Sequence, residues 1–326
     1  MGRERHDRLS RRASPQKDGF GKRDEASGRV QLGVSAGKST LVMLWRFVPA
    51  LERFDPDLLE AFQQKLRVRW THSSTALEGN TLDEGETFGV LQYGLTITGK
   101  PLGHHNEVLG HSRALDLLCG WILERRQFTV SALFELHRAV QAAVEADHFR
   151  PVGAWKRESN STLAKVGGQA VINDTYASPE HVEGLMEAWF REFERLRTDA
   201  AVSALDAYVW SHATFARIHP FTDGNGRMAR LLANVPVLQK GELPILIPVE
   251  KRLAYVESLA TWQMASGKIL PGGDLSGDPS ALEAFGLLCR EAYDASQAMI
   301  EEAVQIQAQR GIRSLESSAK RGHQPS

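Results

Sequence analysis

Residues 219–230 read His-Pro-Phe-Thr-Asp-Gly-Asn-Gly-Arg-Met-Ala-Arg, a polar and glycine-rich stretch between two apolar segments. The upstream segment places five side chains on one face of a helix: Leu205, Tyr208, Val209, His212 and Phe215. This helix must end near Pro220, because proline lacks a backbone N–H and restricts the residue before it. The downstream segment has the same helical spacing: Leu231, Leu232, Val235 and Leu238. The stretch is therefore predicted to form a tight turn between two helices.

The glycines of this turn favour the binding of an anion. Gly224 and Gly226 let consecutive backbone N–H groups converge without interference from a Cβ, and Asn225 lies between them. The start of the second helix adds a partial positive charge that attracts phosphate. We therefore expect Gly224, Asn225 and Gly226 to form a phosphate cradle.

The charged residues around the cradle suit phosphate chemistry. Arg227 and Arg230 are three positions apart, so both guanidinium groups reach the same side of the helix and can grip phosphate oxygens. Asp223 offers a hard oxygen ligand for a Mg²⁺ ion that bridges phosphate oxygens. His219, with an ordinary pKa of about 6.5, is the candidate general base for an attacking hydroxyl.

This stretch resembles the signature of the Fic (Fic/Doc) family, His-Pro-Phe-x-(Asp/Glu)-Gly-Asn-Gly-Arg-x-x-Arg, and it matches at every specified position. The resemblance implies an all-α fold and the transfer of AMP from ATP to a hydroxyl of a target protein. It implies four roles: the base (His219), the Mg²⁺ ligand (Asp223), the anion hole (Gly224, Asn225, Gly226) and the β- and γ-phosphate contacts (Arg227, Arg230). Doc-type kinases carry lysine at the position of Gly226, and phosphocholine-transferring members carry alanine at that of Gly224. The resemblance therefore favours nucleotidyl transfer.

A second motif lies upstream. Residues 74–80, Ser-Thr-Ala-Leu-Glu-Gly-Asn, resemble the inhibitory motif (Ser/Thr)-x-x-x-Glu-(Gly/Asn) of the family class that places it N-terminal to the active site. Ser74 and Glu78 are four positions apart near the end of a predicted helix, where a glutamate can pair with an arginine. With Gly79 completing the motif, the resemblance implies that Glu78 pairs with Arg230 and keeps it from the γ-phosphate. We expect an autoinhibited resting state.

Residues 154–178 interrupt the helical pattern. Gly167-Gly168 and the polar residues 159–162 separate short β-prone pieces, which favours a hairpin. The resemblance implies a flap that holds the target backbone as an added strand, with Val166, Gly167 and Gly168 as its candidate contacts. An ordinary surface hairpin is the alternative.

One stretch departs from the family pattern. Many relatives carry Tyr-Tyr-x-x-Leu-x-x-Ala-Asn after the signature, with the second tyrosine and the asparagine near the adenine. Here Tyr255 is followed by Val256, and Gln263 takes the asparagine position. We expect Tyr255 to line the nucleotide site, while the base preference stays open.

The remaining pattern is helical, as in the spacing of Leu58, Leu59, Phe62, Leu66 and Trp70. The fold class predicted is all-α with a small β-hairpin over the active site. Five segments are expected: a flexible polar tail (1–35), a helical region with the inhibitory motif (36–130), the catalytic core (131–265), a C-terminal helical segment (266–313) and a polar tail (314–326).

Composition excludes several classes of protein. The 326 residues are 42% hydrophobic, too apolar for a wholly disordered chain, and no apolar run approaches the roughly 20 residues that span a bilayer. Lys and Arg number 39 against 40 Asp and Glu, so no global field attracts nucleic acid. We expect a cytoplasmic protein with no membrane partner and no nucleic-acid partner; a homodimer stays open.

The expected cofactors are ATP and Mg²⁺, and the expected partner is a Ser, Thr or Tyr hydroxyl of a target protein. Two alternatives remain. The same site could remove AMP from a modified protein, with Glu78 positioning a water. The chain could also be a non-catalytic regulator that senses nucleotide or associates with DNA through its basic N-terminal tail.

Overall fold

The computed structural model describes the backbone of residues 47–142 and 150–321, with side chains up to residue 310. The predicted tail at 1–35 lies outside these residues. The described helices are α1 (Pro56–Ala76), α2 (Glu84–Tyr93), α3 (Leu102–Leu123), α4 (Val130–Val140), α5 (Pro179–Thr198), α6 (Ala204–Ile218), α7 (Asn225–Gln239), α8 (Arg252–Ser266) and α9 (Glu283–Arg321). Two strands, β1 (Thr162–Val166) and β2 (Gln169–Asn173), and two short 3₁₀ turns, Pro49–Leu51 and Val249–Lys251, complete them. The prediction of an all-α fold with one hairpin is confirmed.

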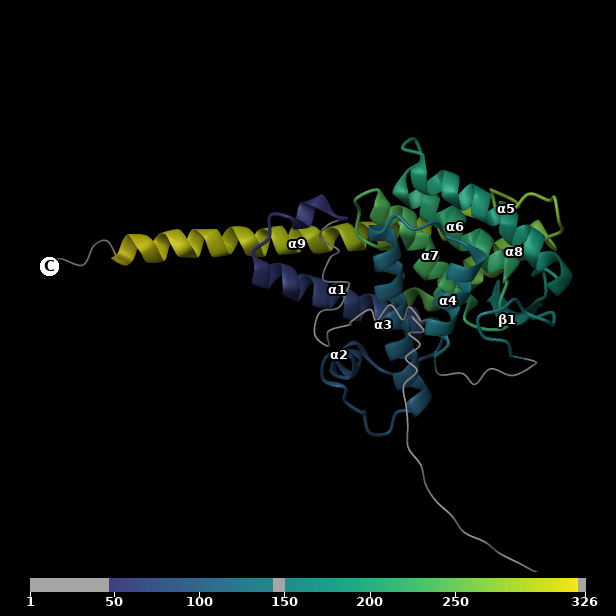
Figure 1. Ribbon diagram of the computed structural model, residues 1–326, viewed down its shortest axis with the longest axis horizontal. Helices are drawn as coiled ribbons and strands as arrows, with labels where there is room; N and C mark the ends of the chain where they lie inside the picture. The colour runs from purple at the N-terminus through teal and green to yellow at the C-terminus, as the bar shows by residue number, and fades with distance from the viewer. Residues whose placement is uncertain (1–46, 143–149, 322–326) are drawn as a thin grey trace, which may run out of the picture. The chain divides into compact units, whose positions relative to one another are not determined.

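Helices α6 and α7 form the centre of the fold (Figure 1). Nearly every side chain of α7 is buried, because α1, α3, α4, α5 and α6 all pack against it. A helix that is covered on all sides places even its polar residues in the interior. The two arginines of the signature are on α7, so both are held inside the protein rather than on its surface.

Helix α1 begins at Pro56, which suits the first turn of a helix because its missing N–H needs no partner there. Its apolar stripe packs into the main core with Leu58, Phe62, Leu66 and Trp70 buried, as the spacing predicts. The C-terminal end of α1 reaches α7. This contact brings residues 74–78 to the signature, more than 150 positions away in the sequence.

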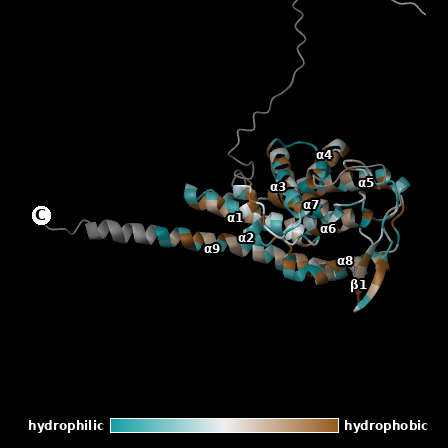
Figure 2. Cartoon of the chain, turned by 90° about the horizontal axis from the view of Figure 1, so that it is seen from below, coloured by the Kyte–Doolittle hydropathy of each residue, from teal (hydrophilic) through white to brown (hydrophobic). Residues whose placement is uncertain are grey.

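The hairpin lies against α8 (Figures 1 and 2). Its strands are antiparallel, and Gly167 and Gly168 form the two-residue turn with positive φ angles of 57° and 84°, as a type I′ turn requires. The N–H of Gly167 donates to Oε1 of Glu257 on α8 at 2.8 Å. Leu163 and Ile172 pair across the strands and are exposed by 76% and 69%.

Helix α9 is longer than the sequence predicts. The pattern suggests helical structure to about residue 313, followed by a polar tail, whereas α9 continues to Arg321. Residues 314–321 are Ser, Leu, Glu, Ala, Lys and Arg, most of which favour helix and none of which breaks it. Part of α9 lies beside α1, where Arg310 pairs with Asp57 at 2.7 Å (Figure 1). None of the helices in 47–142 and 150–321 has the length and apolar character to cross a membrane.

Arg217, near the end of α6, organises the segment that follows α8. Its Nη1 donates to the carbonyls of Asp274 and Leu275 at 3.0 Å each. Its Nη2 donates to the carbonyls of Ser266 and Gly267 at 3.1 and 3.3 Å. The side chain is buried, so its loss leaves several buried carbonyls without a donor.

We expect Arg217→Met to lower the free energy of unfolding by about 3 kcal/mol or more, the cost of breaking a buried charged network. Urea unfolding measures this change. The matched control is Arg195→Met, which removes an arginine whose side chain is 51% exposed and should cost less than about 1 kcal/mol. Equal stability of the two variants would contradict the anchoring role of Arg217.

Candidate active site

His219 is the residue that directly follows α6. Its backbone is left-handed, with φ 53° and ψ 57°. This conformation costs a non-glycine residue about 1–3 kcal/mol and is concentrated at functional sites. Nδ1 donates to the carbonyl of Ala216 at 3.1 Å, because a carbonyl can only accept. In the neutral ring this assignment leaves the lone pair, and therefore the capacity to accept a proton, on Nε2.

The surroundings of His219 keep its imidazole neutral. Burial lowers the pKa of His219 to about 4. The carbonyl of Ala216 opposes this shift, the charge of Lys156 adds to it, and the carboxylates of Glu78 and Asp223 oppose it weakly. At pH 7 the ring is therefore unprotonated, which is the state a general base requires.

Two asparagines fix the turn between α6 and α7. The N–H of Phe221 donates to Oδ1 of Asn225 at 2.9 Å, and Nδ2 of Asn225 donates back to the Phe221 carbonyl at 2.8 Å. Asn160, just before the hairpin, donates to the same carbonyl at 2.9 Å. The side chain of Asn225 therefore shapes the turn, and only its backbone is available to the predicted phosphate cradle.

His137 of α4 supports the turn from the other side. Its Nδ1 accepts the N–H of Gly153 at 2.9 Å, so its Nε2 is the protonated nitrogen and donates to the Asp223 carbonyl at 3.0 Å. Its ring is stacked on Phe221 with the centroids 3.8 Å apart. Burial lowers the pKa of His137 to about 4, so the ring stays neutral and keeps this donor pattern.

The N-terminus of α7 is built to receive an anion. Gly224 occupies the N-cap with φ +78°, a conformation that favours glycine. Gly224 has no side chain with which to cap the helix. The first N–H groups of a helix have no partner within it, so those after Gly224 face the turn. A methyl group at Gly226 would overlap Oε1 of Glu78, which shows that a carboxylate already lies against this helix end.

Arg227 contacts three polar side chains at the far side of the turn. Its Nη1 is 3.4 Å from Oε1 of Glu107, and its Nη2 is 3.3 Å from Oε1 of Gln141 and 3.4 Å from Oδ2 of Asp223. All three contacts are long for charge-assisted hydrogen bonds. The guanidinium is therefore held in place without being tightly paired, and an incoming phosphate can replace these contacts.

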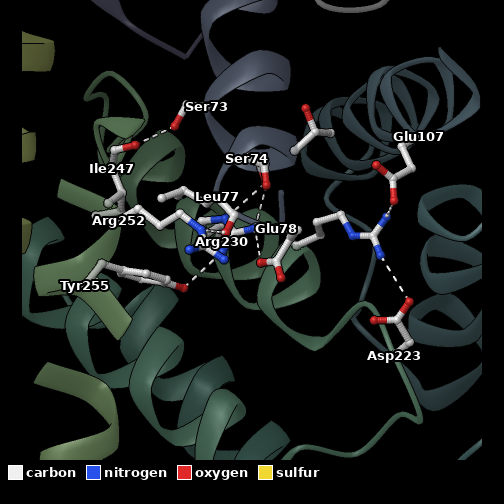
Figure 3. A network of polar contacts seen from close by, with 12 residues as sticks. Ser73, Ser74, Leu77, Glu78, Glu107, Asp223, Arg230, Ile247, Arg252 and Tyr255 are labelled. Atoms are coloured by element: carbon white, nitrogen blue, oxygen red, sulfur yellow. Dashed lines mark hydrogen bonds and ion pairs between the residues drawn. The ribbon is translucent and has the colours of Figure 1, made fainter. Parts of the chain in front are cut away.

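Arg230 is paired tightly (Figure 3). Its Nη2 donates to Oε1 of Glu78 and to the carbonyl of Ser74, both at 2.7 Å. Its Nε donates to the Ser74 hydroxyl at 3.1 Å, and its Nη1 donates to the Tyr255 hydroxyl at 3.0 Å. Burial alone would lower the pKa of Arg230, but Tyr255 and Glu78 raise it above its usual value. The arginine is therefore a permanent cation inside the protein.

Glu78 differs from Arg230 in its exposure. The Arg230 side chain is 3% exposed, whereas that of Glu78 is 37% exposed. The segment that carries Glu78 is anchored on both sides: the Ser73 hydroxyl donates to the Ile247 carbonyl at 2.5 Å, and Nε of Arg252 donates to the Leu77 carbonyl at 2.7 Å (Figure 3). The carboxylate can therefore leave Arg230 for solvent while the backbone around it stays in place.

Asp223 is the one carboxylate of the turn, and its side chain is exposed. Burial opposes its ionisation, but the hydrogen bond to Gln141 and the charge of Arg227 outweigh this effect, so the pKa of Asp223 lies below its usual value. No cluster of three metal-ligating side chains occurs among the residues with described side chains. A lone ionised carboxylate beside a phosphate cradle suits Mg²⁺, which keeps several waters and takes its other ligands from substrate phosphates.

Tyr255 lies beside Arg230, one of the two predicted phosphate contacts. Its hydroxyl faces Arg230 and also contacts Nε2 of His212 at 3.0 Å, so its polar end orders the arginine. Gln263 accepts from Nδ2 of Asn173 at 2.5 Å and thus ties α8 to the end of the hairpin.

Several residues of the site carry no local sequence signal: His137, Gln141, Glu107 and Asn160. They come from α3, α4 and the hairpin region and reach the turn through the fold. Of these residues, the sequence points only to His137, because it is a histidine on the apolar face of a predicted helix, and it is buried in the structure.

Comparison with known proteins agrees with this geometry. Residues 127–237 match the model of the Fic/DOC family. The chain is 33% identical over 192 residues to a protein adenylyltransferase of Caenorhabditis elegans, a match that covers 58% of this chain and 35% of the relative. It is 30% identical over 189 residues to a protein adenylyltransferase of Nematostella vectensis, covering 58% of this chain and 41% of the relative. The chain thus spans little more than a third of the length of the curated relatives it matches.

Solved structures give the same result for the fold. A Fic-domain signalling protein of Bacteroides thetaiotaomicron superposes with a TM-score of 0.69 at 26% identity, over 82% of this chain and 97% of the other. A fragment of C. elegans Fic-1 superposes with a TM-score of 0.58 at 25% identity, over 82% of this chain and 72% of the fragment.

Proposed function

We propose that this chain, whose residues 127–237 form a domain of the Fic/DOC family, is a protein adenylyltransferase that rests in an autoinhibited state. In the proposed reaction, a Ser, Thr or Tyr hydroxyl of a target protein attacks the α-phosphorus of ATP. The new bond joins the hydroxyl oxygen to the α-phosphorus, and the bond from that phosphorus to the α–β bridging oxygen breaks, so pyrophosphate leaves.

One observation carries the proposal. A single turn holds the neutral imidazole of His219, with its lone pair on Nε2, beside the uncapped N-terminus of α7. Two buried arginines follow on that helix. His219 takes the proton of the attacking hydroxyl on Nε2. The N–H groups at the start of α7 stabilise the charge that grows on the phosphate, where losing one donor typically costs about 2.7–4 kcal/mol.

The triphosphate is held by the two arginines of α7. Arg227 and Arg230 lie on the same side of the helix, so each can contact one of the β- and γ-phosphates. Mg²⁺ would be held by Asp223 and the phosphates, and it supplies charge neutralisation between phosphate oxygens.

Autoinhibition is the second part of the proposal. The 2.7 Å bond between Glu78 and Arg230 occupies the guanidinium that the γ-phosphate needs, and the Glu78 carboxylate lies against Gly226, where an anion would bind. ATP bound beside this pair lacks one phosphate contact and is misaligned for attack. Because Glu78 is partly exposed, its release requires no unfolding of α1.

The function is tested by mass spectrometry of a lysate incubated with the protein, ATP and Mg²⁺. We expect adenylyl groups on Ser, Thr or Tyr side chains, which are absent when His219→Asn replaces the wild-type protein. Phosphoryl groups on the same residues would contradict the proposal and favour kinase chemistry. Release of AMP from proteins modified beforehand would favour the alternative, hydrolytic removal of AMP.

The pH dependence of transfer follows from the low pKa of His219. The base acts in its neutral form, so kcat/KM should fall only as the pH drops through the pKa of about 4. We expect a flat profile from about pH 8 to about pH 5, measured with Glu78→Gly to remove inhibition. Recovery of activity after return to neutral pH controls for unfolding. An acid limb near the ordinary pKa of histidine would contradict a buried base.

A further inference from the structure

Tyr176 covers the imidazole of His219. The two rings are stacked with centroids 4.0 Å apart and an interplanar angle of 26°. Tyr176 is 6% exposed and lies in the segment between β2 and α5. The hydrogen bond from Nδ1 to the Ala216 carbonyl fixes one atom of the ring but leaves the tilt of the imidazole plane to its neighbours. The stacked ring therefore limits how far Nε2 can move.

The hydroxyl of Tyr176 is bonded to the hairpin. It lies 2.7 Å from Oγ1 of Thr162, the first residue of β1. Burial raises the pKa of Tyr176, while hydrogen bonds to Thr162 and Asn173 oppose this shift, so the phenol remains neutral at pH 7. One tyrosine thus contacts both the candidate base with its ring face and the hairpin with its hydroxyl.

The hairpin is in turn fixed to α8 at two places. Near the end of the hairpin, Asn173 donates to Gln263 of α8. The Oδ1 of Asn173 also accepts from the N–H and the hydroxyl of Thr175, which fixes the orientation of the Asn173 side chain. At the tip of the hairpin, the N–H of Gly167 donates to Glu257. The Tyr176 hydroxyl, bonded to Thr162 of β1 and to Asn173 of β2, therefore connects both strands of the hairpin to the ring that covers His219.

We propose that Tyr176 is a positioning residue that sets the plane of the His219 imidazole and couples it, through the hydroxyl of Thr162, to the hairpin. The inference rests on the proposed function. A target segment that binds along the hairpin orders Thr162, and Thr162 holds the tyrosine that holds the base. Aligned attack geometry is the part of catalysis most sensitive to small displacements.

The ring contact is tested first without any substrate. In protein with ¹³C-labelled histidine, the His219 C–H resonances, assigned with His219→Asn, should be shifted by the ring current of Tyr176. We expect Tyr176→Phe to keep this shift and Tyr176→Leu to lose it. The control Tyr93→Leu changes a tyrosine that is 66% exposed and should leave these resonances in place. Unmoved His219 resonances in Tyr176→Leu would overturn the proposal.

The coupling to the hairpin is tested by kinetics in the Glu78→Gly background, with an acceptor protein identified by mass spectrometry of the lysate. Tyr176→Leu should lower kcat about 10-fold or more and leave KM for ATP unchanged. Tyr176→Phe should lower kcat less than Tyr176→Leu, because its ring still covers the imidazole. Tyr176→Phe and Thr162→Val should each raise KM for the acceptor by about 2- to 10-fold, the range of one neutral hydrogen bond.

The double variant Tyr176→Phe with Thr162→Val should have the same KM for the acceptor as Tyr176→Phe alone, because Tyr176→Phe already removes the bond to Thr162. Additive effects on KM would overturn the coupling. The two tests separate this inference from the proposed function: if the chain transfers no AMP, the resonances of His219 still report whether Tyr176 positions the ring.

Discussion

Glu78→Gly is expected to raise the rate of AMP transfer by roughly 10- to 100-fold. A hydrogen bond to a charged group contributes about 1.5–3 kcal/mol, and the variant removes that bond from Arg230. Since α1 ends at Ala76, glycine at position 78 does not weaken the helix. The measurement is the initial rate of AMP incorporation into lysate proteins at saturating ATP and Mg²⁺.

The control for this variant is Glu124→Gly. Glu124 also follows the last turn of a helix, α3, and is exposed, but it makes no contact with the signature. We expect its rate to equal that of the wild-type protein. A Glu78→Gly variant with an intact fold and an unchanged or lower rate would rule out inhibition by Glu78 and favour a water-positioning role for that carboxylate.

His219→Ala is expected to lower transfer by about 100-fold or more, the usual contribution of a positioned general base. ATP binding should stay nearly unchanged, because the proposed phosphate contacts are the N–H groups and arginines of α7. Calorimetric titration with ATP and Mg²⁺ measures the binding, and incorporation of AMP measures the transfer.

His219→Asn serves as a second variant with the same expected result. Asparagine tolerates the left-handed backbone of position 219 better than alanine, so it separates loss of the base from backbone strain. Loss of ATP binding together with transfer in both variants would show that the histidine is structural.

The sequence predicts the signature well because its chemistry is local. His219, Asp223 and the two glycines lie within eight positions, and a proline and glycines determine where one helix ends and the next begins. The positive φ of Gly224 and the uncapped start of α7 agree with that pattern. The helical spacing of apolar residues likewise predicts α1, α6 and α7, because a buried stripe on a helix requires only that regular spacing.

The remaining parts of the site depend on contacts between distant segments. Asp223 is held by His137, 86 positions upstream, and Phe221 by Asn160, 61 positions upstream. No periodicity or local motif specifies such pairs. The pair of Glu78 and Arg230 was predicted through the resemblance, because 152 positions separate them in the sequence.

Tyr255 shows what a sequence motif does not specify. Its position in the motif predicts that it lines the nucleotide site, and its hydroxyl contacts Arg230 and His212. A tyrosine that packs its ring in the core and directs its hydroxyl at a buried cation satisfies both groups at once. Which of these contacts a side chain makes is decided by packing, which the sequence motif does not contain.

The central claim is that the chain transfers the α-phosphoryl group of ATP and is restrained by Glu78. The most direct measurement compares wild type, Glu78→Gly and the double variant Glu78→Gly with His219→Ala, each with Mg²⁺ and ATP labelled at the α or the γ phosphorus. We predict protein-bound label from the α position only, stronger in Glu78→Gly and absent in the double variant. Label from the γ position, or none from either despite measurable ATP binding, would contradict the account.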